Sequence, residues 1–481
     1  MGIHFSDSVY DIRKFGAVPD GKTRNTHAFQ EAIGACVQAG GGTVYVPAGE
    51  FRTGPILLKS NITLYLDNGS RLVFSDRIEE YELVDTYWEG KPCKAYSPLL
   101  FAQEAENIAI VGMGKIDGSG SVWWEAHRNH TIAYPRPRLI AFQDCKNISI
   151  QGVTLENSPS WTVNPVFCED ISIDHIKIYN PAHSPNTDGI NPDSCRNVHI
   201  ADCRIDVGDD CVTLKSGTEE RISNRPCQNI TVTDCTMVHG HGGIVIGSEM
   251  SGGVRNVTVS NCVFEGTDRG IRIKTRRKRG GVVENIRISN IIMEKVICPF
   301  VINMYYRCGA SEKDQWVWEE MPYPVSEGTP GIRDIHFSSI TVREAGAAAG
   351  YIAGLAEMPV ERISFSDVDV EMAENPSPGK PAMIHQMEAM RKQGLFLRHA
   401  REITFDHVRI RKTAGAMYQL KDSRRVEFAG CMLRGTDPGI PSVILDHANE
   451  VIFYGCQTGE EKTNPIKLLE TSPDSVIFQN L

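Results

Sequence analysis

The sequence predicts an all-β protein, a right-handed parallel β-helix with an N-terminal capping helix. A short phrase recurs along the chain, in which a polar residue is followed by alternating β-forming residues and a turn, as in NISIQGVTLENS from Asn147. Successive copies from Asn147 to Asn285 start 23 to 32 residues apart, and no amphipathic helix separates them. Such a period with short strands indicates a solenoid, in which each coil buries its inward side chains against its neighbours.

The repeat extends through most of the chain. Strong copies begin at Asn107, Asn147, Asp170, Asn197, Asn229, Asn256 and Asn285, and weaker copies begin at Asp334, Arg362, Glu402, Val426 and Val451. Strands that alternate Ile or Val with polar residues, bounded by Asn, Gly and Asp turns, suit a chain wound into parallel sheets. We therefore expect a single domain over residues 1–481, with β-helical coils over residues 100–481.

A different pattern precedes the coils. Within residues 25–39 the apolar residues Phe29, Ile33 and Cys36 recur at helical spacing, and three glycines follow. An amphipathic helix here would cover the exposed apolar end of the solenoid, although any surface helix could show the same pattern. We assign residues 1–60 to an N-terminal cap region.

Three long connections interrupt the coils, at residues 78–100, 118–138 and 308–330. They carry the aromatic residues Tyr87, Trp88, Trp123, Trp124, Trp316 and Trp318. Long loops on a rigid scaffold often carry binding residues, so we expect these segments to border a ligand site.

Composition limits the classes of function. The formal net charge of −10 argues against a nucleic-acid-binding protein, although a small basic pocket for an anionic ligand remains compatible with it. The N-terminus shows no secretory signal and no run of 18 apolar residues occurs, so we expect a cytoplasmic protein without a membrane span, or a secreted one if a leader was removed. In that setting the 14 cysteines are expected to be buried thiols.

Three carboxylates carry the strongest chemical signal. Asp188 lies in SPNTDGINP, and Asp209 and Asp210 lie in VGDDCVTLKSG, about one coil later. Residues one coil apart stack at about 4.8 Å, the spacing between strands, so the three acids are expected to lie together. Crowded carboxylates repel each other, which favours a proton on one of them and gives an acid beside ionised bases. Asx-type turns are the alternative reading of each acid.

Histidine and basic residues follow at a similar spacing. His241 lies 31 residues after Asp210 and is flanked by glycines, and Arg272 lies a further 31 residues on. Arg272 and Lys274 alternate along one strand, so both point to the same face and can pair with an anionic ligand. We expect all of these residues to form one column, and the later cations of the run, Arg276–Arg279, to remain solvated.

At this point the sequence resembles glycoside hydrolase family 28, the polygalacturonases and their relatives, and in particular their bacterial exo-acting members. The resemblance is carried by four short motifs in order, namely Asn186-Thr187-Asp188, Asp209-Asp210, Gly240-His241-Gly242 and Arg272-Ile273-Lys274. It covers most of the chain from Tyr10 to about residue 330.

The resemblance implies a role for each position. Asp209 would be the general acid, and Asp188 and Asp210 would activate the attacking water, which gives inversion at the anomeric carbon. His241 would maintain the protonation of the acid, and Arg272 and Lys274 would bind a substrate carboxylate. Tyr305 or Tyr306 would contact substrate, and we favour Tyr306. The family requires no cofactor or metal, although His239 beside His241 leaves a cation site as an alternative.

The implied activity is hydrolysis of α-1,4 bonds in galacturonate polymers or oligosaccharides, with exo action expected from the long loops. A rhamnogalacturonan-type substrate is the alternative within the family. A Ca²⁺-dependent β-helix pectate lyase and a non-catalytic carbohydrate-binding solenoid are the alternatives from other classes. We expect no nucleic-acid or membrane partner, and a homo-oligomer is compatible with the sequence.

Overall fold

The computed structural model describes residues 8–221, 224–307, 309–311, 313–434, 439–458 and 465–479. Residues 1–7 of the predicted cap region and residue 308, where the third predicted connection begins, lie outside the described residues. The chain forms two compact units, Met1–Gly240 and His241–Leu481, and each is treated separately below.

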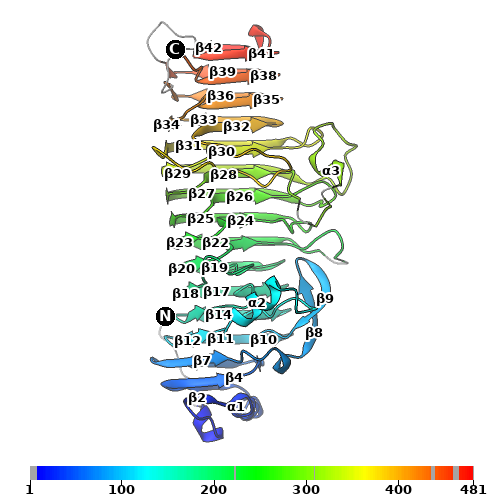
Figure 1. The fold of residues 1–481 in the computed structure, drawn as a ribbon, viewed down its shortest axis with the longest axis vertical. Helices are drawn as coiled ribbons and strands as arrows, with labels where there is room; N and C mark the ends of the chain where they lie inside the picture. Colours follow the sequence, from blue (N-terminus) through cyan, green and yellow to red (C-terminus); the bar gives the residue numbers. More distant parts are fainter. Residues whose placement is uncertain are drawn as a thin grey trace. The chain divides into compact units, whose positions relative to one another are not determined.

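The first unit is built from three ladders of parallel strands (Figure 1). The first ladder consists of β1 (Val9–Asp11), β3 (Gly42–Val46), β6 (Ile62–Leu66), β11 (Glu106–Gly112), β14 (Lys146–Gln151), β17 (Glu169–Asp174), β19 (Arg196–Ala201) and β22 (Cys227–Thr233). The second consists of β2 (Asp20–Arg24), β4 (Gly49–Thr53), β7 (Ser70–Phe74), β12 (Lys115–Asp117), β15 (Thr154–Glu156), β18 (Lys177–Tyr179), β20 (Arg204–Val207) and β23 (Thr236–His239). The third consists of β5 (Ile56–Leu57), β10 (Leu100–Gln103), β13 (Ile140–Gln143), β16 (Val163–Val166) and β21 (Asp210–Leu214).

The second unit is built in the same way, from two ladders of parallel strands. One contains β25 (Val254–Glu265), β27 (Val282–Glu294), β29 (Gly331–Ala345), β31 (Val360–Met372), β33 (Ala400–Asp406), β34 (Arg409–Arg411), β36 (Arg424–Ala429), β37 (Met432–Leu433), β39 (Asn449–Tyr454), β40 (Gln457–Thr458) and β42 (Val476–Gln479). The other contains β24 (Gly242–Ile246), β26 (Arg269–Lys274), β28 (Cys298–Asn303), β30 (Ala348–Ala353), β32 (Gln393–Arg398), β35 (Tyr418–Lys421), β38 (Val443–Asp446) and β41 (Ile466–Leu469). Stacked coils of this kind confirm the predicted parallel β-helix, and the parallel pairing begins well before residue 100.

The polar residue that opens each repeat has a structural role. Asn107, Asn147 and Asn197 have φ values of 56°, 54° and 57°, the left-handed region that asparagine tolerates better than most residues. Their side chains also bond from coil to coil: the Asn107 amide donates to Asn61 at 2.8 Å, and the Asn147 amide donates to Asn107 at 2.7 Å. The repeat therefore begins with Asn or Asp because this turn needs both a left-handed backbone and a side chain that bonds to its neighbour.

Inward side chains form stacks along the coils. In the second unit six phenylalanines lie in register on successive strands, with ring centroids 4.7 to 5.4 Å apart: Phe337, Phe365, Phe405, Phe428, Phe453 and Phe478. The described cysteines are free thiols and all except the partly exposed Cys93 are buried, which agrees with the expected core packing.

The predicted capping helix is α1 (Thr26–Gln38). It buries Phe29, Ile33 and Cys36 and contacts β1, β3, β5 and β6 at the first coils. Among the helices of the described residues, none has the length and apolar character needed to cross a membrane.

The long connections contain ordered elements. Residues 78–100 hold the 3-10 helix η2 (Ile78–Glu80) and an antiparallel hairpin of β8 (Leu83–Trp88) and β9 (Lys91–Tyr96). Residues 118–138 hold α2 (Ser121–Arg128), whose Trp123 and Trp124 are buried, so these two aromatic residues support the fold and do not form a surface. A short helix α3 (Gln315–Trp318) lies in the third connection.

Candidate active site

The first unit brings the three predicted carboxylates together. Ile190 pairs with Val212, so Asp188 and Asp210 occupy equivalent positions on adjacent rungs of the third ladder. The amide of Gly189 donates to the carbonyl of Asp210 at 3.0 Å. One carboxylate oxygen from each of Asp188, Asp209 and Asp210 lies within 4.8 Å of the other two. The spacing of about one coil therefore produces a compact acidic cluster.

The three acids differ in exposure and partners. Asp188 and Asp210 are 3% and 2% exposed, whereas Asp209 is half-buried. Asn191 Nδ2 donates to Asp188 Oδ2 at 3.0 Å. Gly240 has a φ of 77°, and a Cβ at this position would lie 2.2 Å from the Asp209 carbonyl oxygen, so only glycine fits beside the cluster. Asp209 is thus the acid best placed to meet an incoming ligand.

A buried arginine that the sequence analysis missed holds the Asp188 loop. The Arg136 guanidinium donates to the carbonyls of Pro159 and Pro185 at 2.9 and 2.7 Å, and to Asn186 Oδ1 at 2.6 Å. Burial lowers the pKa of Arg136 to about 10, against the opposing effect of Asp188 and Asp209. Arg136 is therefore a positioning residue that also brings positive charge near the acids.

Lys215 supplies a second cation to the cluster. Its Nζ lies 4.0 Å from Asp188 Oδ2, and both side chains are buried. The same ammonium lies 4.3 Å from the ring centroid of Trp161, which stacks on Trp88 with centroids 4.5 Å apart. This series of contacts connects Asp188 with the end of the β8–β9 hairpin.

The hairpin is fixed beside the cluster. Thr218 Oγ1 donates to the carbonyl of Gly90 at 3.2 Å, and Lys91 pairs with Glu220 at 2.6 Å. The Arg221 guanidinium lies 4.8 Å from the ring centroid of Tyr87. The tip of the β8–β9 hairpin, in the predicted connection at 78–100, is therefore held in place and linked to the acidic cluster through Trp161 and Lys215.

The second unit brings together Arg272, Lys274 and Tyr306. Arg272 and Lys274 are 4% and 8% exposed, and their charged groups lie 5.5 and 5.4 Å from the ring centroid of Tyr306. Tyr305 is fully buried and instead contacts the guanidinium groups of Arg277 and Arg398. The geometry places Tyr306 with the two cations and Tyr305 in the interior.

His241 has a carboxylate partner that the sequence did not reveal. Its Nδ1 lies 2.8 Å from Asp268 Oδ2. Burial alone would raise the pKa of Asp268, but the hydrogen bond to His241 and the charges of Arg269 and Arg272 outweigh it and lower the pKa. Because Asp268 is ionised, Nδ1 donates to it, and Nε2 is the ring nitrogen that can exchange a proton. The predicted column from Asp210 to His241 crosses from one unit to the other and stays a prediction.

The end of the basic run differs from the expectation. Arg276, Arg277 and Arg279 are 3%, 4% and 3% exposed, so the prediction that these residues remain solvated is wrong. Arg277 donates to the carbonyls of Trp316, Glu319 and Met321, which shows the reason: the third connection folds back over the run. Lys278 is exposed, with its Nζ 4.0 Å from the centroid of the Trp316 ring.

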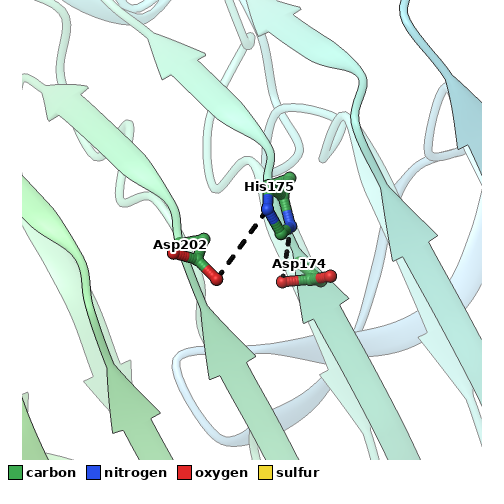
Figure 2. Close-up of side chains that lie close together, drawn as sticks. All are labelled: Asp174, His175 and Asp202. Atoms are coloured by element: carbon green, nitrogen blue, oxygen red, sulfur yellow. Dashed lines mark ion pairs between the residues drawn. The ribbon is translucent and has the colours of Figure 1, made fainter. Parts of the chain in front are cut away.

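Two clusters among the described residues have groups that could ligate a cation. The first is the acidic cluster itself, whose oxygen atoms suit a hard divalent ion, with Lys215 and Arg136 already nearby. The second is Asp174, His175 and Asp202, which Figure 2 shows on neighbouring strand ends. There His175 Nδ1 lies 2.8 Å from Asp174 and Nε2 lies 3.9 Å from Asp202. Carboxylates on both sides of the ring favour an imidazolium, which has no lone pair for a metal.

We expect the titration of His175 to show that its two carboxylate neighbours favour the protonated imidazole. The hydrogen bond to Asp174, with a smaller contribution from Asp202, raises the pKa of His175 above its ordinary value. The protonated form is therefore stabilised at low pH, and this stabilisation is lost as pH rises through the raised folded-state pKa. NMR titration of the imidazole should give a midpoint above about 6.5, the ordinary value, and Asp174→Asn should return it toward that value. A midpoint below 6.5 would contradict the assignment.

Stacked parallel coils and a compact carboxylate cluster place the chain among parallel β-helix proteins with an acidic site. The chain matches the model of "Glycosyl hydrolases family 28" over residues 36–385 and belongs to this family. A probable polygalacturonase of Vitis vinifera is 36% identical over 371 residues, which span 75% of this chain and 73% of the relative. An endo-polygalacturonase of Pectobacterium carotovorum subsp. carotovorum is 33% identical, with 67% of this chain and 78% of the relative covered. The crystal structure of a hyperthermoactive exopolygalacturonase from Thermotoga maritima is similar, with a TM-score of 0.71, 31% identity, and coverage of 85% of this chain and 92% of that chain.

Proposed function

We propose that this protein hydrolyses α-1,4 bonds between galacturonic acid units, acting from a chain end with inversion at the anomeric carbon. The observation that carries the proposal is the cluster of Asp188, Asp209 and Asp210, with oxygen atoms within 4.8 Å in a member of family 28. Three carboxylates at this distance provide both a proton donor and a base for glycoside cleavage. The names of the relatives, both endo- and exopolygalacturonases, support the galacturonate substrate.

The roles of the acids follow from their surroundings and from the family resemblance. Asp209, the half-buried member, protonates the leaving oxygen. Asp188 and Asp210 are buried and activate the attacking water, and the positive charge of Lys215 beside Asp188 favours the ionised form of that carboxylate. His241 accepts or returns a proton through Nε2, while Asp268 holds its Nδ1. Arg272 and Lys274 bind a substrate carboxylate, and Tyr306 packs beside them.

The inverting course is supported by the resemblance and not by the carboxylate distance. Carboxyl groups are about 6.5–9.5 Å apart in inverting enzymes and about 5 Å apart in retaining ones. The 4.8 Å limit in this cluster applies to one oxygen atom of each carboxylate and not to the separation of the carboxyl groups. Proton NMR of the earliest product should therefore show the β-anomer of galacturonate first, and an initial α-anomer would contradict inversion.

Exo action is supported by the hairpin beside the acids. Its Trp88 stacks on Trp161, and Trp161 lies against Lys215, the partner of Asp188. The fixed hairpin at this position limits how far a substrate chain can extend past the acids. The end of a galacturonate chain therefore fits better than its interior.

The direct test is chromatography of the products from defined galacturonate oligomers, with and without a chelator. We expect saturated products released from one chain end, new reducing ends and no effect of the chelator. A spread of mid-length products would contradict exo action, and unsaturated ultraviolet-absorbing products that disappear with chelator would indicate a lyase. Turnover of rhamnogalacturonan oligomers alone would contradict the substrate assignment.

A further inference from the structure

A separate pocket lies farther along the same ladder of the second unit as Arg272. It has a volume of about 440 Å³. Its floor includes Tyr351 and Phe396, whose rings stack with centroids 5.0 Å apart and an interplanar angle of 23°. Its polar lining consists of Glu388, Arg391, Gln393 and Gln419. Apart from Tyr351, these residues lie beyond residues 36–385, the part of the chain that matches the family.

The pocket and Arg272 share one row of outward positions. Parallel register pairs Arg272 with Val301, Val301 with Tyr351 and Tyr351 with Phe396. The row then continues from Phe396 to Gln419 (Figure 1, β26 to β35). At about 4.8 Å per rung, Tyr351 lies about 10 Å and Phe396 about 14 Å from Arg272 along the ladder. The two sites are therefore in line on one face of one sheet.

One loop touches both sites. The segment 379–390 is closed by reciprocal backbone bonds between Gly379 and Met390, at 2.9 and 2.7 Å. Met383 Sδ lies 3.1 Å from Arg272, and Asn303 Nδ2 donates to the Met383 carbonyl at 3.1 Å. The end of the same segment, from Glu388 onward, lines the pocket. A ligand chain that left Arg272 along this loop would reach the stacked aromatic rings.

We propose that this pocket binds a uronic acid unit of the substrate chain, several units from the bond that is cleaved. The half-buried ring of Phe396, stacked on Tyr351, gives an apolar face for the C–H groups of a sugar ring. Arg391 is an exposed residue, and its guanidinium, which lies 3.4 Å from Asn375 Oδ1, pairs with the uronate carboxylate. Gln393, Gln419 and the Glu388 carboxylate accept hydrogen bonds from sugar hydroxyls. This inference rests on the proposed function, because it assumes a galacturonate chain held at Arg272.

The test compares short and long substrates. For Arg391→Ala we expect kcat/KM to fall about tenfold on hexagalacturonate, since a charge-assisted hydrogen bond is lost, and to stay within about twofold on di- and trigalacturonate. Phe396→Ala should show the same dependence on chain length, and Arg391→Lys should recover part of the loss. The matched controls are Arg409→Ala and Tyr454→Ala, at exposed positions of the other ladder. These variants should keep the wild-type kcat/KM on both short and long substrates.

Binding separates this inference from the proposed function. Titration calorimetry of the Asp209→Asn protein should show that the added Arg391→Ala change weakens the binding of hexagalacturonate. The same change should leave the binding of trigalacturonate unaltered. Equal losses on short and long oligomers, or no loss on hexagalacturonate, would overturn the inference while hydrolysis itself remained. Absence of turnover on every galacturonate oligomer by the wild-type chain would instead overturn the proposed function.

Discussion

Replacement of Asp209 by asparagine is expected to lower kcat about 10²–10⁴-fold, the range that a positioned general acid contributes. The amide has nearly the same shape as the carboxyl group, so it keeps the local packing but cannot deliver a proton to the leaving oxygen. Because Asp209 is only half-buried, the change should leave the fold intact. Reducing-end release from trigalacturonate measures kcat, and calorimetry on the same variant should show that ligand still binds.

A surface aspartate in the same unit provides the control for this variant. Asp234 is exposed, and its carboxylate accepts a hydrogen bond from the neighbouring Thr233. Asp234→Asn makes the same chemical change at a distance from the acids and should keep wild-type kcat. If Asp209→Asn retained full turnover, Asp209 would not be the acid. If the wild type bound oligomers without cleaving them, the carbohydrate-binding solenoid would be the better description.

The repeat made the fold predictable because the same local requirement recurs in every coil. Asn107, Asn147 and Asn197 each lie at the start of a strand in a left-handed conformation, and each side chain bonds to an adjacent coil. The period also predicted the acidic cluster, because Asp188 and Asp210 fall at equivalent positions of adjacent rungs. Residues that follow the period within one unit, such as these two acids, could be placed from the sequence.

The residues that could not be predicted come from segments outside the period. Arg136 reaches Asn186 from a connection 50 positions earlier, and no spacing relates the two residues. The loop 379–390 reaches Arg272 across 111 positions, and nothing in its composition marks that contact. The prediction that Arg277 is solvated was wrong for the same reason, because a connection distant in the sequence, which includes Trp316, folds over it. Long-range packing of irregular segments carries no local signal.

Removal of the Arg277 side chain is expected to have the largest effect on stability. Arg277 and Glu357 form a buried ion pair at 2.6 Å, with side chains 5% and 3% exposed. Removing one partner of such a pair leaves an uncompensated charge and typically costs about 3–5 kcal/mol. Arg277→Ala also leaves the carbonyls of Trp316 and Glu319 without this donor, so the segment around α3 should loosen.

Three measurements check this expectation for Arg277→Ala. Denaturant unfolding should show the loss of stability, and hydrogen exchange should rise first in residues 313–330. The third measurement uses pH: burial would raise the pKa of Glu357, but the hydrogen bond from Arg277 outweighs it and lowers the pKa. The stabilisation that ionised Glu357 gives the folded protein is therefore complete above its unfolded-state pKa of about 4.3. It is lost as the pH falls through the lower folded-state pKa. The variant should lack this acid-dependent loss.

The control for Arg277→Ala is an ion pair of similar length at the surface. Arg333 and Glu284 lie 2.6 Å apart with side chains 38% and 22% exposed, and such pairs contribute about 0–1 kcal/mol. Arg333→Ala should therefore change the unfolding free energy by less than about 1 kcal/mol. Equal losses for both variants would mean that burial of the Arg277–Glu357 pair is not what fixes the α3 segment.

The α3 segment also carries Trp318, whose ring stacks on His385 of the 379–390 loop with ring centroids 4.7 Å apart. The same loop contacts Arg272 through Met383. Because of these contacts, a loosened α3 segment in Arg277→Ala should also weaken the binding of long galacturonate oligomers.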